Sequence, residues 1–481
     1  MYIHMIHKYK NNGYNIVLDV CSGSVHIVDD CVCDLLDITD DLYSGFGQFS
    51  VMDILGSVSL ACQTEEGSEK YSKYGQTEIA ESAEEIAELI SSGQLYTEDE
   101  YKDMLVDYRK RQTVVKALCL HVSHDCNLSC RYCFAQEGEY HGDRGLMSPE
   151  VAKASLDFLV KNSGSRRNLE VDFFGGEPLM NWDTVVETVN YGRSLEEKYD
   201  KKFRFTLTTN GTLMKDEYLD FINREMDNIV LSIDGRKQIN DLMRPHRGGQ
   251  GSYDEIVPVF KKIAESRNQE KYYVRGTFTR NNLDFAEDVR HLADLGFKQI
   301  SVEPVVASPE DDYAIRDEDL DRLCEEYDKL ARLYLEYRKA GKPFNFFHFM
   351  IDLEGGPCVY KRLSGCGSGT EYLAVTPWGD LYPCHQFVGN DDFCLGNVYD
   401  GVKRTDIVSE FKVCNVYARE SCRDCFARFY CSGGCAANAY NFHGSILDVY
   451  EAGCTLQRKR IECAIMIKAA LAEDEEGEME K

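Results

Sequence analysis

Hydrophobic and polar positions in the middle of the chain alternate between two patterns. Short strand-like segments rich in apolar residues are separated by longer segments whose apolar residues recur every three or four positions. The first pattern indicates buried strands and the second indicates amphipathic helices. Strands are predicted at residues 117–123, 169–174, 203–208, 228–233, 273–279 and 299–302, with helices between them, for example at 149–161 and 184–199. The alternation predicts an α/β fold, a partial (β/α)6 TIM-like barrel, whose site lies at the carboxyl ends of the strands.

The two ends of the chain carry different patterns. Apolar runs at 14–20 and 25–28, separated by Gly23, predict a β-hairpin. Residues 356–456 are rich in Gly and Cys and show little periodicity, so we expect loops held by metal rather than by a large apolar core. Further helices are predicted at 29–39, 78–90, 317–339 and 455–473.

Length and charge narrow the class of protein. A chain of 481 residues is too long for one compact core, so two or three domains are expected. The formal charge of −28 argues against a nucleic-acid partner, because phosphate binding needs a basic face. The sequence has neither a signal-peptide pattern nor a run of about 18 apolar residues, so we expect no membrane partner and a cytoplasmic location.

Cysteine is the most informative residue type. The chain has 20 cysteines, and 11 of them lie from Cys358 to Cys463. A reducing cytoplasm disfavours a disulfide framework, so metal ligation or catalysis is expected to account for many of them.

One group of cysteines follows the first predicted barrel strand. Cys126, Cys130 and Cys133 form a C-x3-C-x2-C pattern. Three thiolates leave one iron of a [4Fe–4S] cluster without a protein ligand, and a small molecule with an amine and a carboxylate can chelate that iron. A zinc site that lacks one ligand is the alternative interpretation.

This spacing resembles the signature of the radical S-adenosylmethionine (SAM) superfamily, including the aromatic Tyr132 before the third cysteine. The resemblance implies that the cluster and SAM together generate a 5′-deoxyadenosyl radical. It also implies cofactor-binding residues at the ends of the later strands. They are Gly175, Gly176 and Glu177 of a GGEP motif, Asn210 after the third strand, Ser232 at the end of the fourth strand, and Arg244. Arg244 is predicted to pair with the cofactor carboxylate, and an ordinary surface arginine is the alternative.

A second group of cysteines resembles the SPASM extension of radical SAM enzymes that modify peptides. Its pattern is Cys366-x12-Gly379-x4-Cys384, then Cys422-x2-Cys425-x5-Cys431-x3-Cys435, then Cys454. By resemblance, Cys422, Cys425, Cys431 and Cys454 hold one auxiliary [4Fe–4S] cluster, and Cys366, Cys384 and Cys435 hold the other. Cys358 or a substrate cysteine would complete the second cluster. A structural zinc ribbon is the alternative to both clusters.

The sequence also suggests a substrate. In sulfatase-activating relatives an aspartate follows the second cysteine of this extension, whereas this chain has His385, which either acts as a base or packs near the cluster. Residues 6–20, 365–372 and 383–386 resemble maturases of SCIFF peptides, which have six cysteines in forty-five residues. That resemblance implies a winged-helix-like N-terminal domain that binds the leader of a precursor peptide as an added strand. A plain packing domain is the alternative.

The predicted activity is therefore thioether formation between cysteines and acceptor residues of a cysteine-rich precursor peptide, with Cys384 and His385 as catalytic residues. The expected cofactors are SAM and three [4Fe–4S] clusters, and the expected electron donor is a ferredoxin or flavodoxin. A formylglycine-forming sulfatase maturase and a non-catalytic zinc-stapled peptide-binding scaffold are the alternatives. The predicted domains are residues 1–110 for leader recognition, 111–315 for the barrel, 316–355 for a linking helix and bridge, and 356–481 for the SPASM domain with its C-terminal helix and acidic tail.

Overall fold

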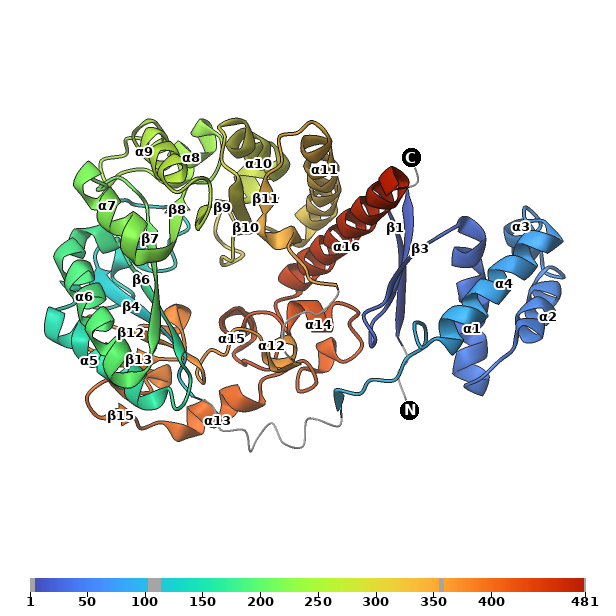
Figure 1. The fold of residues 1–481 in the computed structure, drawn as a ribbon, viewed down its shortest axis with the longest axis horizontal. Coiled ribbons are helices and arrows are strands. Elements are labelled where there is room, and N and C mark those ends of the chain that lie inside the picture. Colours follow the sequence, from blue (N-terminus) through green and yellow to red (C-terminus); the bar gives the residue numbers. More distant parts are fainter. Residues whose placement is uncertain (1–4, 103–113, 354–358, 480–481) are drawn as a thin grey trace.

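A computed structural model describes residues 5–102, 114–353 and 359–479 of the chain. Figure 1 shows a large open barrel at one end of the molecule and a group of helices from the N-terminal part at the other end. The C-terminal helix α16 (Glu451–Met479) and a small sheet lie between these two parts.

The barrel is built on a sheet of 12 strands whose central part is parallel. Its strands run in the order β11-β10-β9-β8-β7-β6-β4-β12-β13-β14-β15, and β5 pairs with β4. The barrel strands are β4 (Ala117–His124), β5 (Gly145–Leu146), β6 (Asn168–Gly175), β7 (Lys202–Thr209), β8 (Met226–Ser232), β9 (Tyr272–Phe278), β10 (Gln299–Pro304) and β11 (Asn345–Phe346). All six predicted barrel strands are present, and each bound lies within two residues of its prediction.

Helices connect the strands and cover the outside of the barrel (Figure 1). The helix α5 (Pro149–Asn162) begins where the sequence predicts it, with the Ser148 hydroxyl accepting a hydrogen bond from the backbone of Val151 and proline in the first turn. The other helices of this region are α6 (Trp182–Tyr199), α7 (Asp216–Glu225), α8 (Lys237–Met243), α9 (Tyr253–Ser266), α10 (Phe285–Asp294) and α11 (Leu320–Lys339).

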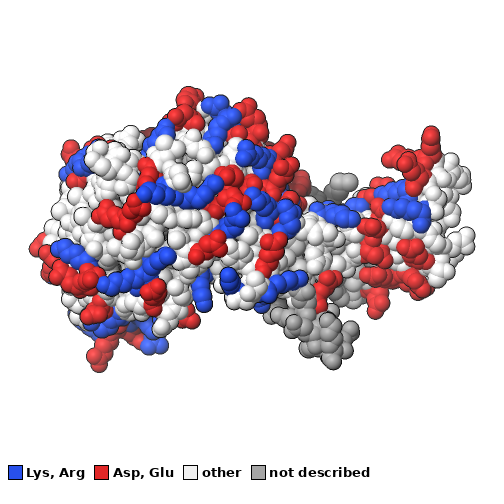
Figure 2. All heavy atoms as spheres, turned by 90° about the horizontal axis from the view of Figure 1, so that it is seen from above, with Lys and Arg blue, Asp and Glu red and all other residues white. Residues whose placement is uncertain are grey.

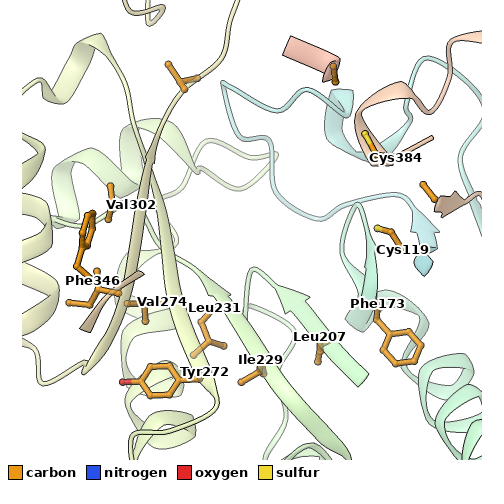
Figure 3. Packing of buried hydrophobic residues seen from close by; sticks show 14 of the residues in the cluster. Cys119, Phe173, Leu207, Ile229, Leu231, Tyr272, Val274, Val302, Phe346 and Cys384 are labelled. Carbon is orange, nitrogen blue, oxygen red and sulfur yellow. The ribbon is translucent and has the colours of Figure 1, made fainter. Parts of the chain in front are cut away.

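The core lies between the sheet and these helices. Phe173, Leu207, Leu231 and Val274, from four successive strands, are all fully buried, and Figure 3 shows them along the sheet. The apolar side chains of β6 and β7 alternate with more polar and more exposed ones, so one face of these strands is buried against the helices and the other is only partly covered. The barrel is therefore a rigid scaffold for the loops at its carboxyl edge.

The N-terminal part forms a three-stranded antiparallel sheet followed by helices. The predicted hairpin is present as β2 (Tyr14–Asp19) and β3 (Val25–Val28), and β1 (Ile6–Asn11) adds a strand that the sequence pattern did not reveal. The helices are α1 (Asp30–Phe46), α2 (Val51–Ala61), α3 (Glu65–Tyr71) and α4 (Gln76–Ser91). The first helix is longer than predicted and ends only at Gly47, which adopts a left-handed conformation.

The cysteine-rich region differs from its prediction. It contains regular elements and an apolar core that is continuous with the barrel, including the buried Leu381, Phe387 and Phe411. The strand β12 pairs in parallel with β4, so this region extends the barrel sheet. The elements are α12 (Val359–Ser364), β12 (Tyr372–Val375), β13 (Asp380–Tyr382), β14 (Gly396–Asn397), β15 (Gly401–Val402), α13 (Thr405–Val413), α14 (Arg428–Cys431) and α15 (Ala436–His443).

Contacts between distant segments join the N-terminal sheet to the rest of the molecule. His7 on β1 contacts Glu462 on α16 at 2.9 Å and stacks on Phe426, with ring centroids 3.5 Å apart. The Asn11 side chain donates to Asp328 on α11 at 2.7 Å. These contacts hold the sheet against α16 and the cysteine-rich region.

The described surface shows no single dominant charge on the face drawn in Figure 2, where acidic and basic side chains are interspersed. Among the described residues, no helix has the length and apolar character needed to cross a membrane.

Candidate functional site: three groups of cysteines

The loop that carries Cys126, Cys130 and Cys133 follows β4 directly, at the carboxyl edge of the barrel. Backbone hydrogen bonds hold this loop in place. The N–H of Ser129 donates to the Pro245 carbonyl at 2.8 Å, and the N–H of Arg131 donates to the Met243 carbonyl at 2.9 Å. The first group of cysteines therefore lies where a parallel sheet places its site.

Two glycines pack directly against this loop. A Cβ on Gly175 would lie 2.2 Å from the Ser123 carbonyl oxygen, and a Cβ on Gly176 would lie 2.1 Å from the Asp125 carbonyl oxygen. The N–H of Gly176 donates to Ser123 at 2.7 Å, and the N–H of Glu177 donates to Asp125 at 2.9 Å. The GGEP motif thus positions the residue that precedes Cys126, and only glycine allows that close approach.

The carboxylate of Glu177 is buried and accepts three hydrogen bonds from the chain. The donors are the Leu179 N–H at 2.9 Å, the Thr209 hydroxyl at 2.7 Å and the Asn210 N–H at 2.8 Å. These bonds connect the end of β6 to the end of β7. Glu177 therefore has a visible structural role in addition to the cofactor contact predicted for it.

Asn210, predicted to bind the cofactor, lies beside the cysteine loop after β4. Its side-chain amide lies 3.7 Å from the Cys126 sulfur and donates to the Asn127 side chain at 3.0 Å. Hydrogen bonds to cluster sulfurs are one way in which proteins tune such clusters.

Tyr132, Asp234 and Arg244 form a buried network beside Cys130. The Tyr132 hydroxyl lies 2.8 Å from both oxygens of Asp234, and Arg244 donates to that hydroxyl at 2.7 Å. Arg244 Nε is buried and has no partner among the described residues. Arg244 is thus not a surface arginine, and its free donor fits an anionic group at this site. Ser232 ends β8 at the same edge of the sheet.

Burial raises the pKa of the Cys126 thiol to about 12 and that of the Cys130 thiol to about 11. The Arg244 guanidinium opposes the rise at Cys130, and charge on Cys133 adds to it. A thiolate in such a place needs a bound cation, and a cluster of iron ions supplies positive charge. The three cysteines of this loop, with Arg244 beside Cys130, therefore suit an iron–sulfur cluster bound by three thiolates.

The second group consists of Cys422, Cys425, Cys431 and Cys454. All four line one cavity of about 170 Å³. These are the four cysteines that the sequence assigned to one auxiliary cluster. They come from four separate turns and helices, so only the fold brings them together.

The third group surrounds Cys366. Burial is the main cause of the raised thiol pKa at Cys384 and Cys435, and charge on Cys366 raises both further. The pKa of the Cys414 thiol is raised mainly by burial. The Arg419 guanidinium lowers this pKa, and charge on Cys366 raises it. Cys366 and Cys414 share a cavity, Cys384 is buried and Cys435 is exposed. The assignment of Cys366, Cys384 and Cys435 to one cluster stays a prediction.

Cys384 and His385 lie where the third group meets the barrel. The His385 ring centroid is 5.6 Å from that of Phe134, just after the cluster loop, and 5.1 Å from that of Phe174 on β6. His385 Nδ1 is 3.4 Å from the Tyr372 hydroxyl. Burial lowers the pKa of His385 to about 4, which leaves the imidazole neutral near pH 7. Figure 3 shows Cys384 on the same side of the core as Cys119 of β4.

The described residues contain no group of three or more His, Cys, Asp or Glu side chains that would hold a single metal ion. In a cubane cluster each thiolate binds a different iron, so its ligands are spread more widely than the ligands of one ion. Cys358, the other candidate for the open position, lies outside the described residues.

Sequence reasoning gave no role to Cys414 or Arg419. Arg419 Nη2 lies 3.2 Å from the Cys414 sulfur, and both residues line the cavity beside Cys366. Neither belongs to a recognisable spacing, so only their position in the fold draws attention to them.

Comparisons with known proteins agree with this geometry. Residues 120–292 match the Radical SAM superfamily. An uncharacterized protein of Methanocaldococcus jannaschii is 28% identical over 310 residues, covering 64% of this chain and 96% of that protein. The radical SAM cyclopropyl synthase TigE of Paramaledivibacter caminithermalis is 22% identical over 369 residues, covering 72% of each chain. A cysteine-type anaerobic sulfatase-maturating enzyme of Clostridium perfringens is 24% identical over 337 residues, covering 65% of this chain and 86% of the enzyme.

Solved structures show the same fold. Native anSMEcpe with bound AdoMet superposes with a TM-score of 0.62 and 20% identity, covering 75% of this chain and 99% of that one. SuiB of Streptococcus suis, bound to S-adenosylmethionine, has a TM-score of 0.51 and 16% identity, covering 94% of this chain and 99% of that one. This chain therefore shares the fold of these two proteins.

Proposed function

Residues 120–292 form a radical SAM domain, and from this premise we propose that the chain is a maturase that forms thioether bonds in a cysteine-rich precursor peptide of the SCIFF type. The proposal includes three [4Fe–4S] clusters, one at Cys126, Cys130 and Cys133 and two at the auxiliary cysteines. It also includes a low-potential electron donor such as a ferredoxin or flavodoxin.

One observation carries the proposal. Cys384 and His385 belong to the auxiliary cysteine region, yet His385 contacts Phe134 and Phe174 at the carboxyl edge of the barrel. The pairing of β12 with β4 fixes this arrangement, because Cys384 follows shortly after that strand pair. A peptide cysteine beside Cys384 would therefore lie near the place where a radical is generated, and thioether formation needs both groups together.

Cys126, Cys130 and Cys133 would hold the first cluster, which together with SAM would supply a carbon-centred radical for removal of one hydrogen atom from the peptide. The residues of this chain position that chemistry. Gly175 and Gly176 allow the close packing of the loop, and Asn210 donates toward the Cys126 sulfur. Arg244, with its free Nε, is suited to bind the carboxylate of the cofactor, and Tyr132 holds Arg244 in place.

The reaction replaces one C–H bond and one S–H bond of the peptide with a C–S bond. One hydrogen atom leaves in 5′-deoxyadenosine, the thiol proton leaves to a base, and one electron leaves the product. The imidazole of His385 is neutral near pH 7 and so can accept a proton, but burial lowers its pKa to about 4 and makes it a weak base. His385 therefore fits this role only when the thiol is already acidified by ligation to a metal. The auxiliary cysteines would hold the acceptor for the electron. Cys414 joins Cys358 and a substrate cysteine as a candidate for the fourth position beside Cys366, Cys384 and Cys435.

The N-terminal sheet is the proposed site for the leader of the peptide. It has three antiparallel strands in the order β1-β2-β3, so β1 and β3 are its outer strands. An outer strand offers unpaired backbone groups to which an extended peptide can add. Contacts of His7 and Tyr9 with Glu462 on α16 connect this sheet to the rest of the protein. A leader bound here would tether the cysteine-rich core of the peptide near the barrel.

Formation of formylglycine is the second candidate, supported by the similarity to the sulfatase-maturating enzyme. Co-expression of the chain with a small cysteine-rich peptide encoded nearby, followed by alkylation and mass spectrometry, distinguishes the candidates. A thioether lowers the peptide mass by two hydrogens and leaves the cysteine sulfur unalkylated. A new aldehyde would instead identify formylglycine. Colourless, zinc-containing protein after anaerobic reconstitution with iron and sulfide would refute both and support a scaffold.

A further inference from the structure

A buried arginine lies at the boundary between the two groups of auxiliary cysteines. Arg419 is 2% exposed, and it lines the same cavity as Cys366 and Cys414. Its backbone carbonyl accepts a hydrogen bond from the N–H of Cys422, at 3.1 Å, and Cys422 lines the other cavity. One residue therefore touches both cysteine groups.

The side chain of Arg419 lies against the wall that separates the two cavities. Gly433 lines the cavity of Cys422, and Gly434 lines the cavity of Cys366. A Cβ on Gly433 would lie 3.6 Å from Arg419 Cδ and Nη1, and a Cβ on Gly434 would lie 3.8 Å from Nη1. The guanidinium thus packs against the backbone of the Cys431-to-Cys435 turn.

The positive charge of Arg419 has no carboxylate partner among the described residues. Its Nη2 donates to the Ile446 carbonyl at 2.8 Å and approaches the Cys414 sulfur at 3.2 Å, whereas the buried Nε has no partner. Arg428, also buried, is different, because it pairs with Asp99 at 2.9 Å. A buried charge without a counter-ion is costly, so a negatively charged group is expected beside Arg419.

We infer that Arg419 is a positioning residue whose buried charge lies between the two auxiliary clusters and raises the reduction potential of both. This inference rests on the proposed function, because it requires clusters at both groups. Reduction adds negative charge to a cluster, and a nearby cation stabilises the reduced form in a medium of low dielectric constant. Arg419 thereby favours transfer of the electron that leaves the peptide to these clusters.

The test is an EPR-monitored redox titration of the full-length, reconstituted protein without peptide. A Cys126→Ala/Cys130→Ala/Cys133→Ala background removes the first cluster, so only auxiliary signals are measured. In that background Arg419→Gln is expected to lower the reduction potential of both clusters. At a fixed applied potential, the ratio of reduced to oxidised cluster should fall by at least about tenfold, which corresponds to a lowering of about 59 mV for a one-electron couple. Arg419→Lys keeps the charge and is expected to stay close to the parent.

The matched control is Arg423→Gln, which removes an exposed arginine four residues away. Equal shifts in the Gln and Lys variants of Arg419, or unchanged potentials in both, would overturn the inference while leaving the proposed function intact. If Arg419→Gln does not retain its clusters, a wild-type potential in the Lys variant supports the inference and a shifted one overturns it. An iron count near zero in the background protein would overturn both the inference and the cluster assignment.

Discussion

The close packing of Gly176 against the cluster loop gives a quantitative prediction for Gly176→Ala. The added Cβ would lie 2.1 Å from the Asp125 carbonyl oxygen and 3.1 Å from the Cys126 backbone nitrogen. An ordinary contact needs at least 3.4 Å, so the loop must retreat by about 1 Å. The atoms it meets are backbone atoms, which cannot move away by rotation of a side chain. The backbone of Asp125 must therefore move, and Cys126, the next residue, moves with it.

A misplacement of about 1 Å at a reacting centre lowers rates by about 10²-fold. We expect Gly176→Ala to lower the rate of 5′-deoxyadenosine formation by that order, or to lose the first cluster. The assay combines that rate, measured by liquid chromatography after anaerobic reduction with dithionite, with the iron count per chain. A loss confined to the first cluster leaves the auxiliary clusters and about eight of about twelve irons in place.

Gly142→Ala is the matched control, because a Cβ at Gly142 would lie 3.7 Å from the Glu139 carbonyl oxygen, an ordinary contact. It should form 5′-deoxyadenosine at the wild-type rate. A Gly176→Ala protein with the wild-type rate and full iron content would refute the idea that this glycine sets the position of Cys126. If Gly176→Ala and Gly142→Ala lose the same share of the rate of 5′-deoxyadenosine formation, the loss does not come from the close contact at Gly176.

Three further predictions follow from named contacts. Cys454→Ala should lower the iron count from about twelve to about eight while 5′-deoxyadenosine still forms, and an unchanged count would remove Cys454 from the ligands. Arg244→Gln should raise the KM for SAM by about 10- to 100-fold, since a hydrogen bond to a charged group contributes about 1.5–3 kcal/mol; an unchanged KM would contradict the predicted carboxylate contact. Arg428→Met should lower the free energy of unfolding by about 1.5–3 kcal/mol, because the half-buried Asp99 carboxylate loses its charged partner and keeps only the Tyr417 hydroxyl and the Tyr101 N–H. Denaturant unfolding checks this value, and a loss below about 1 kcal/mol would contradict it.

The barrel could be predicted from the sequence because its strands carry regular apolar patterns with one face fully buried. The runs at β6 and β7, for example, alternate large apolar side chains over eight residues each, and helices of regular period separate them. The strand β1 escaped prediction because its sequence, IHKYKN, is largely polar and only half buried. Backbone pairing with β2, and not an apolar pattern of its own, makes this segment a strand.

The site could be predicted in part for a similar reason. The resemblance to the SPASM pattern implied a set of four cysteines, and these four line one cavity, although Cys454 lies 23 residues after the nearest of the other three. The strand β12 has only four residues, too few to show a period, and its partner β4 lies more than 200 residues earlier in the chain. Cys414 and Arg419 gain meaning only from such distant contacts. Their positions beside Cys366 could not be derived from spacing.

The central claim is that Cys126, Cys130 and Cys133 hold a cluster with one iron open to SAM. Its most direct measurement is 5′-deoxyadenosine formed by the anaerobically reconstituted protein with dithionite and SAM, in wild type and in Cys130→Ala. The nucleoside is expected in wild type and absent from the variant, which should still bind the leader of the peptide. Nucleoside formed equally by Cys130→Ala, or none formed by fully loaded wild-type protein, would contradict the account.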